Sequence, residues 1–313
     1  MSNISQAKPK ILVLLASRNG GTNILQQLDS IQAQVDVELS IVIQDDKSTD
    51  DTAQLITDYA KAHCDNVQVF LNEAGTGSAG GNFKKLFTRV DASNFDYIAL
   101  ADQDDIWLSD KLIRAVNCLC ASNAGGYSAA VEAFWPDGRT RILQQSNKIS
   151  DVDFLFEGAG QGCTFVIPVR IFEKVQAFCL ENSAIISKIH YHDWLIYLLV
   201  RAWHETWYFD QDVAMRYRQH EGNEIGSRGS IGAFQYRIKK IKNGWYREQI
   251  QCALNIHYLA ADPSLQLVYF QKLLLERNNF LRKLKISFFL LNHGRRKFSE
   301  RIFLIFCAIC GWI

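Results

Sequence analysis

The sequence predicts an α/β protein with a mainly parallel sheet, followed by a helical C-terminal extension. Three almost wholly apolar runs, at residues 10–16, 39–43 and 97–100, have the length and composition of strands buried on both faces of a sheet. Amphipathic stretches with helical spacing separate these runs. Strands that alternate with helices form parallel βαβ units, in which helices cover both faces of the sheet.

The chain up to residue 121 alternates regularly between the two kinds of segment. Apolar side chains that recur every three or four positions predict a helix, as Ile24, Leu28 and Ile31 do. Thr49 or Asp50 can cap the helix that follows the second strand. We expect strands at 10–16, 39–43, 67–71 and 97–100, and helices at 22–34, 52–62, 83–90 and 110–121.

The pattern becomes less regular after residue 121 and helical after residue 230. We expect strands at 127–134, 139–143, 163–167, 207–209 and 213–218, and helices at 171–178, 194–202, 234–244, 246–259 and 265–281. A last apolar run covers residues 302–313. It is shorter than the roughly 20 residues that a membrane-spanning helix needs, so we expect it not to cross a bilayer.

Charge is unevenly distributed along the chain, although the net charge is only +1. Residues 1–224 contain 19 Lys and Arg against 29 Asp and Glu, whereas residues 225–313 contain 15 against 4. The acidic part is suited to binding a cation with phosphate, and the basic part to an anionic surface. An acidic front without a recognition motif behind it argues against a nucleic-acid binder. Residues 1–10 contain no signal-peptide core, so we expect a cytoplasmic protein with reduced cysteines.

Three carboxylates follow the strand at 97–100 within four residues: Asp102, Asp104 and Asp105. A capping role explains one such aspartate but not all three. The charges repel one another, and a divalent cation with a substrate phosphate would offset this repulsion, because Mg²⁺ takes one or two carboxylates together with phosphate oxygens. Ligands of parallel sheets bind at the carboxyl ends of the strands, so we expect a nucleotide here.

Two other polar turns, at residues 17–21 and 45–51, follow predicted strands and are expected at the same sheet edge. The glycine-rich stretch 75–81 has neither a Walker nor a dinucleotide-binding signature. It is either a flexible loop or backbone that approaches a substrate.

Asp193 opens a predicted helix, where the helix dipole stabilises a carboxylate. Its neighbours His192 and Trp194 add an aromatic wall that suits a sugar ring.

Taken in order, these motifs resemble family 2 glycosyltransferases. They read ASRNG at 16–20, IQDDKSTD at 43–50, DQDDIW at 102–107, HDW at 192–194 and YRQHEGN at 217–223. The last three look most like bacterial rhamnosyltransferases that build O-antigen or capsule from dTDP-L-rhamnose. The resemblance covers roughly residues 10–226. It implies the GT-A fold, a Rossmann-like mixed sheet with flanking helices, over 1–226, and a helical extension over 227–313.

The resemblance also implies roles for individual residues. It assigns nucleotide binding to Ser17, Asn19, Asp45, Asp46 and Asp102, and a divalent cation, Mg²⁺ or Mn²⁺, to Asp104 and His220. It makes Asp193 the general base, and places Gly162, Cys163, Thr164, His192 and Trp194 around the sugar and acceptor.

The resulting hypothesis is an inverting, metal-dependent glycosyltransferase that moves L-rhamnose to a glycan or a lipid-linked acceptor. One alternative is the same fold with a UDP- or GDP-sugar donor, and another is an inactive scaffold that binds nucleotide sugars. The basic tail is expected to lie on the cytoplasmic face of the bacterial inner membrane. Otherwise its last helix docks on its own domain, or on a second copy in a homo-oligomer. The cations of the tail are Arg282, Lys283, Lys285, Arg295, Arg296, Lys297 and Arg301.

Overall fold

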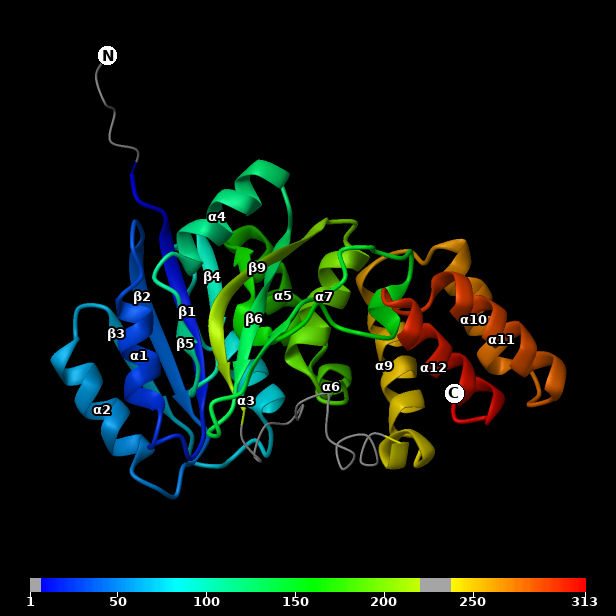
Figure 1. Cartoon of the computed structure of the whole chain (residues 1–313), viewed down its shortest axis with the longest axis horizontal. Coiled ribbons are helices and arrows are strands. Elements are labelled where there is room, and N and C mark those ends of the chain that lie inside the picture. The colour runs from blue at the N-terminus through cyan, green and yellow to red at the C-terminus, as the bar shows by residue number, and fades with distance from the viewer. Residues whose placement is uncertain (1–6, 220–237) are drawn as a thin grey trace, which may run out of the picture.

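One mixed β-sheet forms the centre of the protein in a computed structural model that describes residues 7–219 and 238–313 (Figure 1). Its strands within these ranges are β1 (Lys10–Ser17), β2 (Glu38–Asp45), β3 (Val67–Leu71), β4 (Tyr97–Ala101), β5 (Ile106–Trp107), β6 (Gly126–Phe134), β7 (Thr140–Leu143), β8 (Val166–Pro168) and β9 (Trp207–Arg218). The strand order is β3-β2-β1-β4-β8-β6-β9-β5, and β7 pairs with β6.

The first half of the sheet is parallel, as the sequence predicts. Strand β1 pairs in parallel with β2 and β4, and β2 pairs in parallel with β3. The connecting helices are α1 (Ile24–Gln32), α2 (Thr52–Ala62) and α3 (Ala79–Phe87). Because Ser17 and Asp45 are register partners at the ends of β1 and β2, the polar turns after these strands lie at one edge.

The second half of the sheet is mixed. Strand β8 pairs antiparallel with both β4 and β6, whereas β6 and β9 are parallel. The two short strands expected at 207–209 and 213–218 are one strand, β9, so that prediction was wrong. The β6–β9 register shifts between Ala129, opposite Asp210, and Ala130, opposite Val213. This irregularity, typical of a β-bulge, interrupts the alternation of side chains without ending the strand.

The two faces of the sheet are covered by different helices. Side chains of one face, among them Val13 and Leu15, share a core cluster with residues of α1, α2 and α4 (Lys111–Ser122). Those of the other face, among them Leu12 and Leu14, pack with α3, α5 (Val169–Glu181) and α7 (His192–Ala202). A short helix, α6 (Ser183–Ile186), and two 3₁₀ turns, η1 (Asp153–Leu155) and η2 (Gly162–Thr164), complete this half.

Two local predictions near the strand ends were wrong. Residues 163–167 were expected to be a strand, but 162–164 form the turn η2, and β8 begins only at Val166. Helix α3 begins at Ala79, inside the glycine-rich stretch. Ser78 accepts a hydrogen bond from the Gly81 amide at 3.0 Å and thereby caps this helix. A serine N-cap satisfies an amide that would otherwise lack a partner, which favours an early helix start.

The C-terminal region contains four helices in residues 245–313: α9 (Trp245–Ala260), α10 (Leu265–Leu275), α11 (Phe280–His293) and α12 (Phe298–Ile309). The single helix expected at 265–281 is divided between α10 and α11. Asn279 begins α11, because its side chain accepts a hydrogen bond from the Arg282 amide at 2.8 Å. Residues 234–237 of the helix expected at 234–244, and the predicted domain boundary after residue 226, lie outside the described residues.

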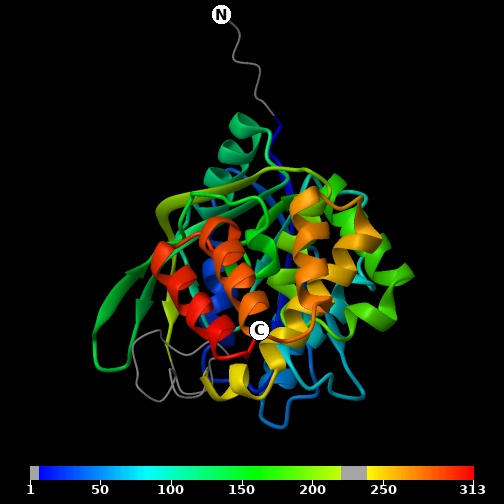
Figure 2. The ribbon, with the colours of Figure 1, turned by 90° about the vertical axis from the view of Figure 1, so that its right-hand side faces the viewer.

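The C-terminal helices share a hydrophobic core with one face of the sheet. Leu254, Phe270, Leu290 and Leu304 belong to the same buried cluster as Leu100 of β4. Figure 2 shows α10, α11 and α12 side by side at one end of the molecule. In the described ranges, no helix combines the length and the apolar composition needed to span a bilayer.

Candidate active site

Asp45 joins the turns that follow β1 and β2. Its buried carboxylate accepts hydrogen bonds from Ser17 Oγ at 3.1 Å, from Ser48 N at 2.8 Å and from Ser48 Oγ at 2.5 Å. The Asn19 amide donates to Ser48 Oγ at 2.8 Å, and Asn19 Oδ1 accepts from Thr49 N at 2.8 Å. The structure therefore brings together three predicted nucleotide-binding residues, Ser17, Asn19 and Asp45.

Asp46 fixes the start of the glycine-rich stretch to the end of β2. It is buried, and its carboxylate accepts from Asn72 Nδ2 at 3.0 Å and from Thr76 N and Oγ1, each at 2.8 Å. The backbone near Thr76 thus lies beside the polar turns, which fits the interpretation of this stretch as backbone near a substrate. Asn72 and Thr76 were not predicted from the sequence.

A buried amide network supports the same edge, and the sequence analysis did not identify it. Gln44 Nε2 donates to Asn82 Oδ1 at 2.9 Å, and Asn82 Nδ2 donates to the Gln44 carbonyl at 3.0 Å. Arg89 Nη1 donates to Gln44 Oε1 at 3.0 Å and to Asn72 Oδ1 at 3.2 Å. Gln44 offered a signal, because a glutamine at the end of an apolar strand needs buried partners.

The acidic motif after β4 is attached to the turn after β1 through Gln103. The Arg18 amide donates to Gln103 Oε1 at 2.7 Å, and Gln103 Nε2 donates back to the Arg18 carbonyl at 3.0 Å. A Cβ at position 20 would lie 2.4 Å from Gln103 Oε1, so a larger residue there would displace the Gln103 side chain from these bonds. Asp102 is half-buried, and Asp104 is 9% exposed. The acidic motif and the first turn therefore form one polar surface.

Asp105 differs from the other two aspartates of the motif. It is almost fully buried and accepts a hydrogen bond from the Arg218 amide at 3.2 Å. Burial raises the pKa of its carboxyl well above the usual value, and the charges of Asp104 and Asp102 raise it further. Burial likewise raises the pKa of the Cys163 thiol, so that the thiol stays protonated.

Asp102, Asp105 and Cys163 each offer a possible metal ligand, and these ligand atoms lie within 4.8 Å of one another. A hard divalent cation prefers oxygen ligands to sulfur, so the Cys163 thiol is a poor ligand for Mg²⁺. The less buried carboxylates of Asp102 and Asp104 fit such a cation better. His220, the other predicted metal ligand, lies outside the described residues.

Helix α7 begins with the motif His192-Asp193-Trp194, and its first turn packs against η2. A Cβ at position 162 would lie 2.7 Å from His192 Nε2 and 3.1 Å from Asp193 Cβ, so Gly162 is required for this contact. The His192 ring stacks on Phe83 of α3, with the ring centroids 4.0 Å apart. Gly162, His192 and Asp193 therefore lie together, while their roles at the sugar and acceptor stay predictions.

The turn η2 separates the acidic motif from the start of α7. Cys163 lies beside Asp102 and Asp105, whereas its neighbour Gly162 lies against Asp193. The side chains of Cys163 and Thr164 are fully buried. Gly162 is buried as well, so none of the three residues is exposed to an acceptor in this structure.

Trp194 and His192, the other two residues of the HDW motif, are both buried. Trp194 is 4% exposed, and its Nε1 donates to the Phe154 carbonyl at 2.7 Å, which makes it a core residue rather than an open wall for a sugar. Burial lowers the pKa of His192 to about 3, with a smaller contribution from Lys84, so the ring is neutral at physiological pH. Such a weakly basic imidazole favours Asp193 over His192 as a proton acceptor.

Comparison with known proteins assigns this site to a family. The model of Glycosyl transferase family 2 matches residues 12–189, which include the turns after β1 and β2, the acidic motif and η2. The chain belongs to this family. The predicted resemblance is thus confirmed, and the protein is a glycosyltransferase.

Two relatives extend this assignment beyond the matched domain. The glycosyltransferase is 35% identical over 302 residues to dTDP-rhamnosyl transferase RfbG of Shigella flexneri, covering 94% of this chain and 99% of that protein. It is 22% identical to the UDP-Glc:alpha-D-GlcNAc-diphosphoundecaprenol beta-1,3-glucosyltransferase WfgD of Escherichia coli, over 59% of this chain and 68% of that protein. The similarity to RfbG therefore includes the C-terminal helices.

Solved structures resemble the glycosyltransferase in fold. The mannosyltransferase PcManGT from Pyrobaculum calidifontis, in complex with GDP-Man and Mn²⁺, superposes with a TM-score of 0.54 at 14% identity, covering 96% of this chain and 86% of that one. Together with the mixed sheet and its flanking helices, this likeness confirms the predicted GT-A fold.

Proposed function

We propose that the protein transfers L-rhamnose from dTDP-L-rhamnose to a glycan or lipid-linked acceptor, with inversion at the anomeric carbon. The observation that carries this proposal is the position of η2, which holds Asp193 on one side and the acidic motif on the other. A base and a diphosphate site on opposite sides of one turn suit attack from the face opposite the leaving group. The rhamnosyl donor is supported by the extensive similarity to RfbG.

In this mechanism, the turns after β1 and β2 hold the nucleotide through Ser17, Asn19, Asp45 and Asp46. The acceptor hydroxyl attacks the anomeric carbon, the bond to the diphosphate breaks, and Asp193 takes the hydroxyl proton. The sugar passes through an oxocarbenium-like state, as it does in glycoside hydrolysis. A divalent cation, Mg²⁺ or Mn²⁺, held by Asp102 and Asp104 would neutralise charge on the leaving diphosphate.

A UDP- or GDP-sugar donor is the second candidate, because WfgD is named for UDP-Glc and PcManGT was solved with GDP-Man. The test is a panel of dTDP-L-rhamnose, UDP-glucose and GDP-mannose, with release of the nucleoside diphosphate as the readout. We expect dTDP-L-rhamnose to be turned over fastest. Preference for another donor would remove the rhamnosyl assignment and leave the transferase intact.

We also propose that the enzyme works at the cytoplasmic face of the bacterial inner membrane, where a lipid-linked acceptor would be reached. Helices α11 and α12 each have an outward row of apolar side chains with spacing i, i+4, i+8 and i+11, which is one face of a helix. The rows are 37–74% exposed and consist of Phe280, Leu284, Phe288 and Leu291, and of Phe298, Ile302, Phe306 and Ile309. We call these eight residues the outward apolar face.

The charges around this face favour a lipid surface over a second copy of the chain. Residues 265–313 contain nine Lys and Arg and only two acids, Glu276 and Glu300. Two of these cations are not available to lipid, because the side chains of Arg282 and Arg296 are buried. The others are at least partly exposed, so they would attract anionic headgroups but would repel one another across a symmetric dimer.

A further inference from the structure

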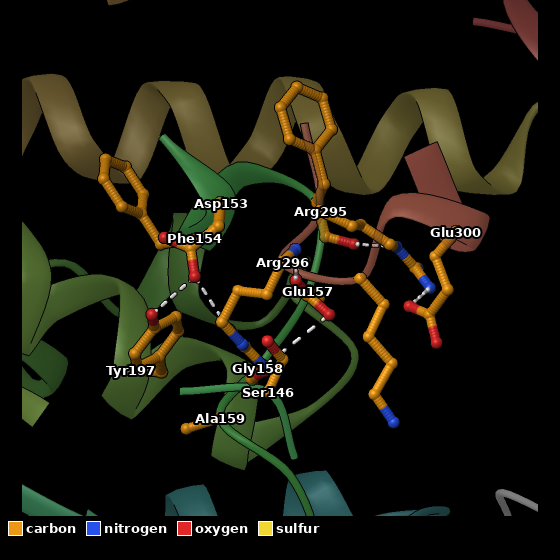
Figure 3. A network of polar contacts seen from close by, with 12 residues as sticks. Ser146, Asp153, Phe154, Glu157, Gly158, Ala159, Tyr197, Arg295, Arg296 and Glu300 are labelled. Atoms are coloured by element: carbon orange, nitrogen blue, oxygen red, sulfur yellow. Dashed lines mark hydrogen bonds and ion pairs between the residues drawn. The ribbon is translucent and has the colours of Figure 1, made fainter. Parts of the chain in front are cut away.

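We propose that the turn between α11 and α12 positions the acceptor half of the active site, with Arg296 as the positioning residue. This inference rests on the proposed function, because it assigns the proton-accepting step to Asp193. Figure 3 shows Arg296 reaching from that turn to Asp153, Glu157 and Gly158 of the catalytic region. The side chains of Arg296 and Asp153 are 1% and 0% exposed, so this contact is sealed from water.

Arg296 forms a fork between three acceptors of one segment. Its Nη1 donates to Asp153 Oδ2 at 2.8 Å, and its Nη2 donates to the Gly158 carbonyl at 2.7 Å. The Arg296 amide donates to Glu157 Oε1 at 2.5 Å, and Nη2 lies 3.6 Å from Glu157 Oε2. The planar guanidinium fixes the relative positions of its acceptors, which a flexible ammonium group cannot do.

Asp153 connects Arg296 to helix α7 through further hydrogen bonds. The same carboxylate accepts from Tyr197 Oη at 2.6 Å and from Arg201 Nη1 at 2.9 Å. Both donors lie on α7, one and two turns after Asp193. Arg296 therefore reaches, through a single carboxylate, the helix that carries the proposed base.

Gly158 provides a second connection from Arg296 to the site. A Cβ at position 158 would lie 3.3 Å from the Cα of Trp194, so the segment packs directly on the first turn of α7. The chain then continues to Gly162, which contacts Asp193. Residues 153–162 are thus held between α7 on one side and the turn of Arg296 on the other.

The neighbouring arginine strengthens this attachment at the backbone. Arg295 Nε donates to the Phe156 carbonyl at 3.0 Å, and Tyr246 Oη of α9 donates to the same oxygen at 2.6 Å. Burial raises the pKa of Glu157, an effect that Arg296 and Arg295 oppose. Well-packed apolar side chains can stabilise a core as well as buried ions can, so a network of this size is better explained by the geometry that it imposes.

The inference is tested with the full-length variants Arg296→Lys and Arg296→Gln. Lys297→Gln is the matched control, since it loses a charge on the same turn but its Nζ donates only to the Gln144 carbonyl. The readouts are the dTDP dissociation constant by calorimetry, the rate of dTDP-L-rhamnose turnover with water as acceptor, and amide hydrogen exchange over 153–164 and 41–50. Arg296→Lys keeps the buried charge, so we expect it to disturb the fold less than Arg296→Gln, and exchange over 41–50 reports on the rest of the fold.

For Arg296→Lys we expect turnover to fall by roughly ten- to a hundredfold, because a small displacement of a catalytic group has an effect of that size. The dTDP dissociation constant should remain unchanged, and exchange should accelerate over 153–164 but not over 41–50. Unchanged turnover, or equal losses in turnover and dTDP binding, would overturn the inference. If the unmodified protein does not turn over dTDP-L-rhamnose, the proposed donor fails, and the exchange pattern decides this inference separately.

Discussion

Asp104 lies three residues after the buried strand β4, together with two more carboxylates, and this residue-scale feature was readable from the sequence. Two like charges about 4 Å apart repel by about 1–4 kcal/mol, depending on the effective dielectric constant. A diphosphate adds further negative charge. We therefore predict that chelation of divalent cations weakens dTDP binding by roughly tenfold or more. Calorimetric titration with and without chelator measures this difference.

Asp104→Asn should make the two titrations converge, because the variant loses a cation ligand. Asp137→Asn, on the exposed turn between β6 and β7, is the control and should keep the difference. Equal affinities of the unmodified protein in the two buffers would exclude a role for the cation in nucleotide binding.

Asp193 is the second residue on which the proposal depends. Asp193→Asn preserves the size and hydrogen bonding of the side chain but cannot take a proton. General base catalysis contributes typically ~10²–10⁴-fold, so we predict a fall of that size in the turnover of dTDP-L-rhamnose. The dTDP dissociation constant should not change, because Asp193 lies on the acceptor side of η2. Turnover at the rate of the unmodified enzyme would assign the proton to another group.

Sequence reasoning found the polar residues of the site that follow strands or begin helices, but not the buried amide network that supports them. Asp45, Asp102 and Asp193 follow or begin recognisable elements. Asn82 and Arg89 lie far from those elements in the chain, and only the packing of α3 against β2 brings them to Gln44. A single sequence carries no signal for such a tertiary contact.

At the scale of elements, the start of α4 contains a buried lysine. Lys111 Nζ lies 3.3 Å from the centroid of the Trp107 ring, and within the described ranges it has no hydrogen-bond acceptor. Burial lowers the pKa of Lys111 to about 7. Between that value and the ordinary value of 10.5, the unfolded chain binds a proton that the folded protein does not. Stability should therefore rise with pH across this window, by about 1.4 kcal/mol per pH unit.

We predict that Lys111→Met removes this rise and stabilises the protein at pH values below the window. Urea denaturation at several pH values from neutral to alkaline measures the slope. Lys61→Met, at a position with 70% side-chain exposure on α2, is the matched control and should keep the slope of the unmodified protein. The same slope in Lys111→Met would mean that Lys111 does not titrate in this range.

Periodicity predicted most elements well, and its failures have local physical causes. Helix α2 and strand β3 have the predicted bounds because their apolar patterns end in polar turns. The start of α3, the break before α11 and the continuity of β9 depend on a serine cap, an asparagine cap and a β-bulge. Caps and bulges involve single residues, so a pattern averaged over several turns does not resolve them.

At the scale of the whole molecule, composition indicated a basic rear but not which of its cations are exposed. Arg295 and Arg296 were expected to meet an anionic surface, whereas the structure uses them to attach the last two helices to the catalytic region. Buried charges of this kind cannot be recognised from charge counts. The exposed apolar side chains of α11 and α12 therefore carry more weight in the membrane proposal than the arginines do.

The outward apolar face gives the last prediction. Phe288 and Phe306 are 71% and 51% exposed, so their replacement by glutamate leaves the core intact. Burial of a phenylalanine side chain contributes about 1.5–3 kcal/mol, so the double variant Phe288→Glu/Phe306→Glu should bind vesicles at least roughly tenfold more weakly. Co-sedimentation with vesicles of phosphatidylcholine and phosphatidylglycerol measures this, while dTDP binding should remain unchanged. Binding by the unmodified protein should also weaken with salt and with vesicles of phosphatidylcholine alone, because residues 265–313 carry an excess of cations over acids.

Ile142→Glu, a substitution at a 58% exposed position on β7, is the matched control and should bind vesicles like the unmodified protein. The outward apolar face could instead contact a second copy of the chain. Analytical ultracentrifugation distinguishes this possibility from membrane binding, because it measures the oligomeric state. If the unmodified protein is a dimer that does not bind vesicles, and the double variant is a monomer, then α11 and α12 contact another protomer. Under the membrane proposal, the double variant and the unmodified protein have the same oligomeric state and differ only on lipid. The charge distribution favours this second outcome, since a symmetric interface would bring together Lys283 and Arg301 of both copies with few acids to offset them.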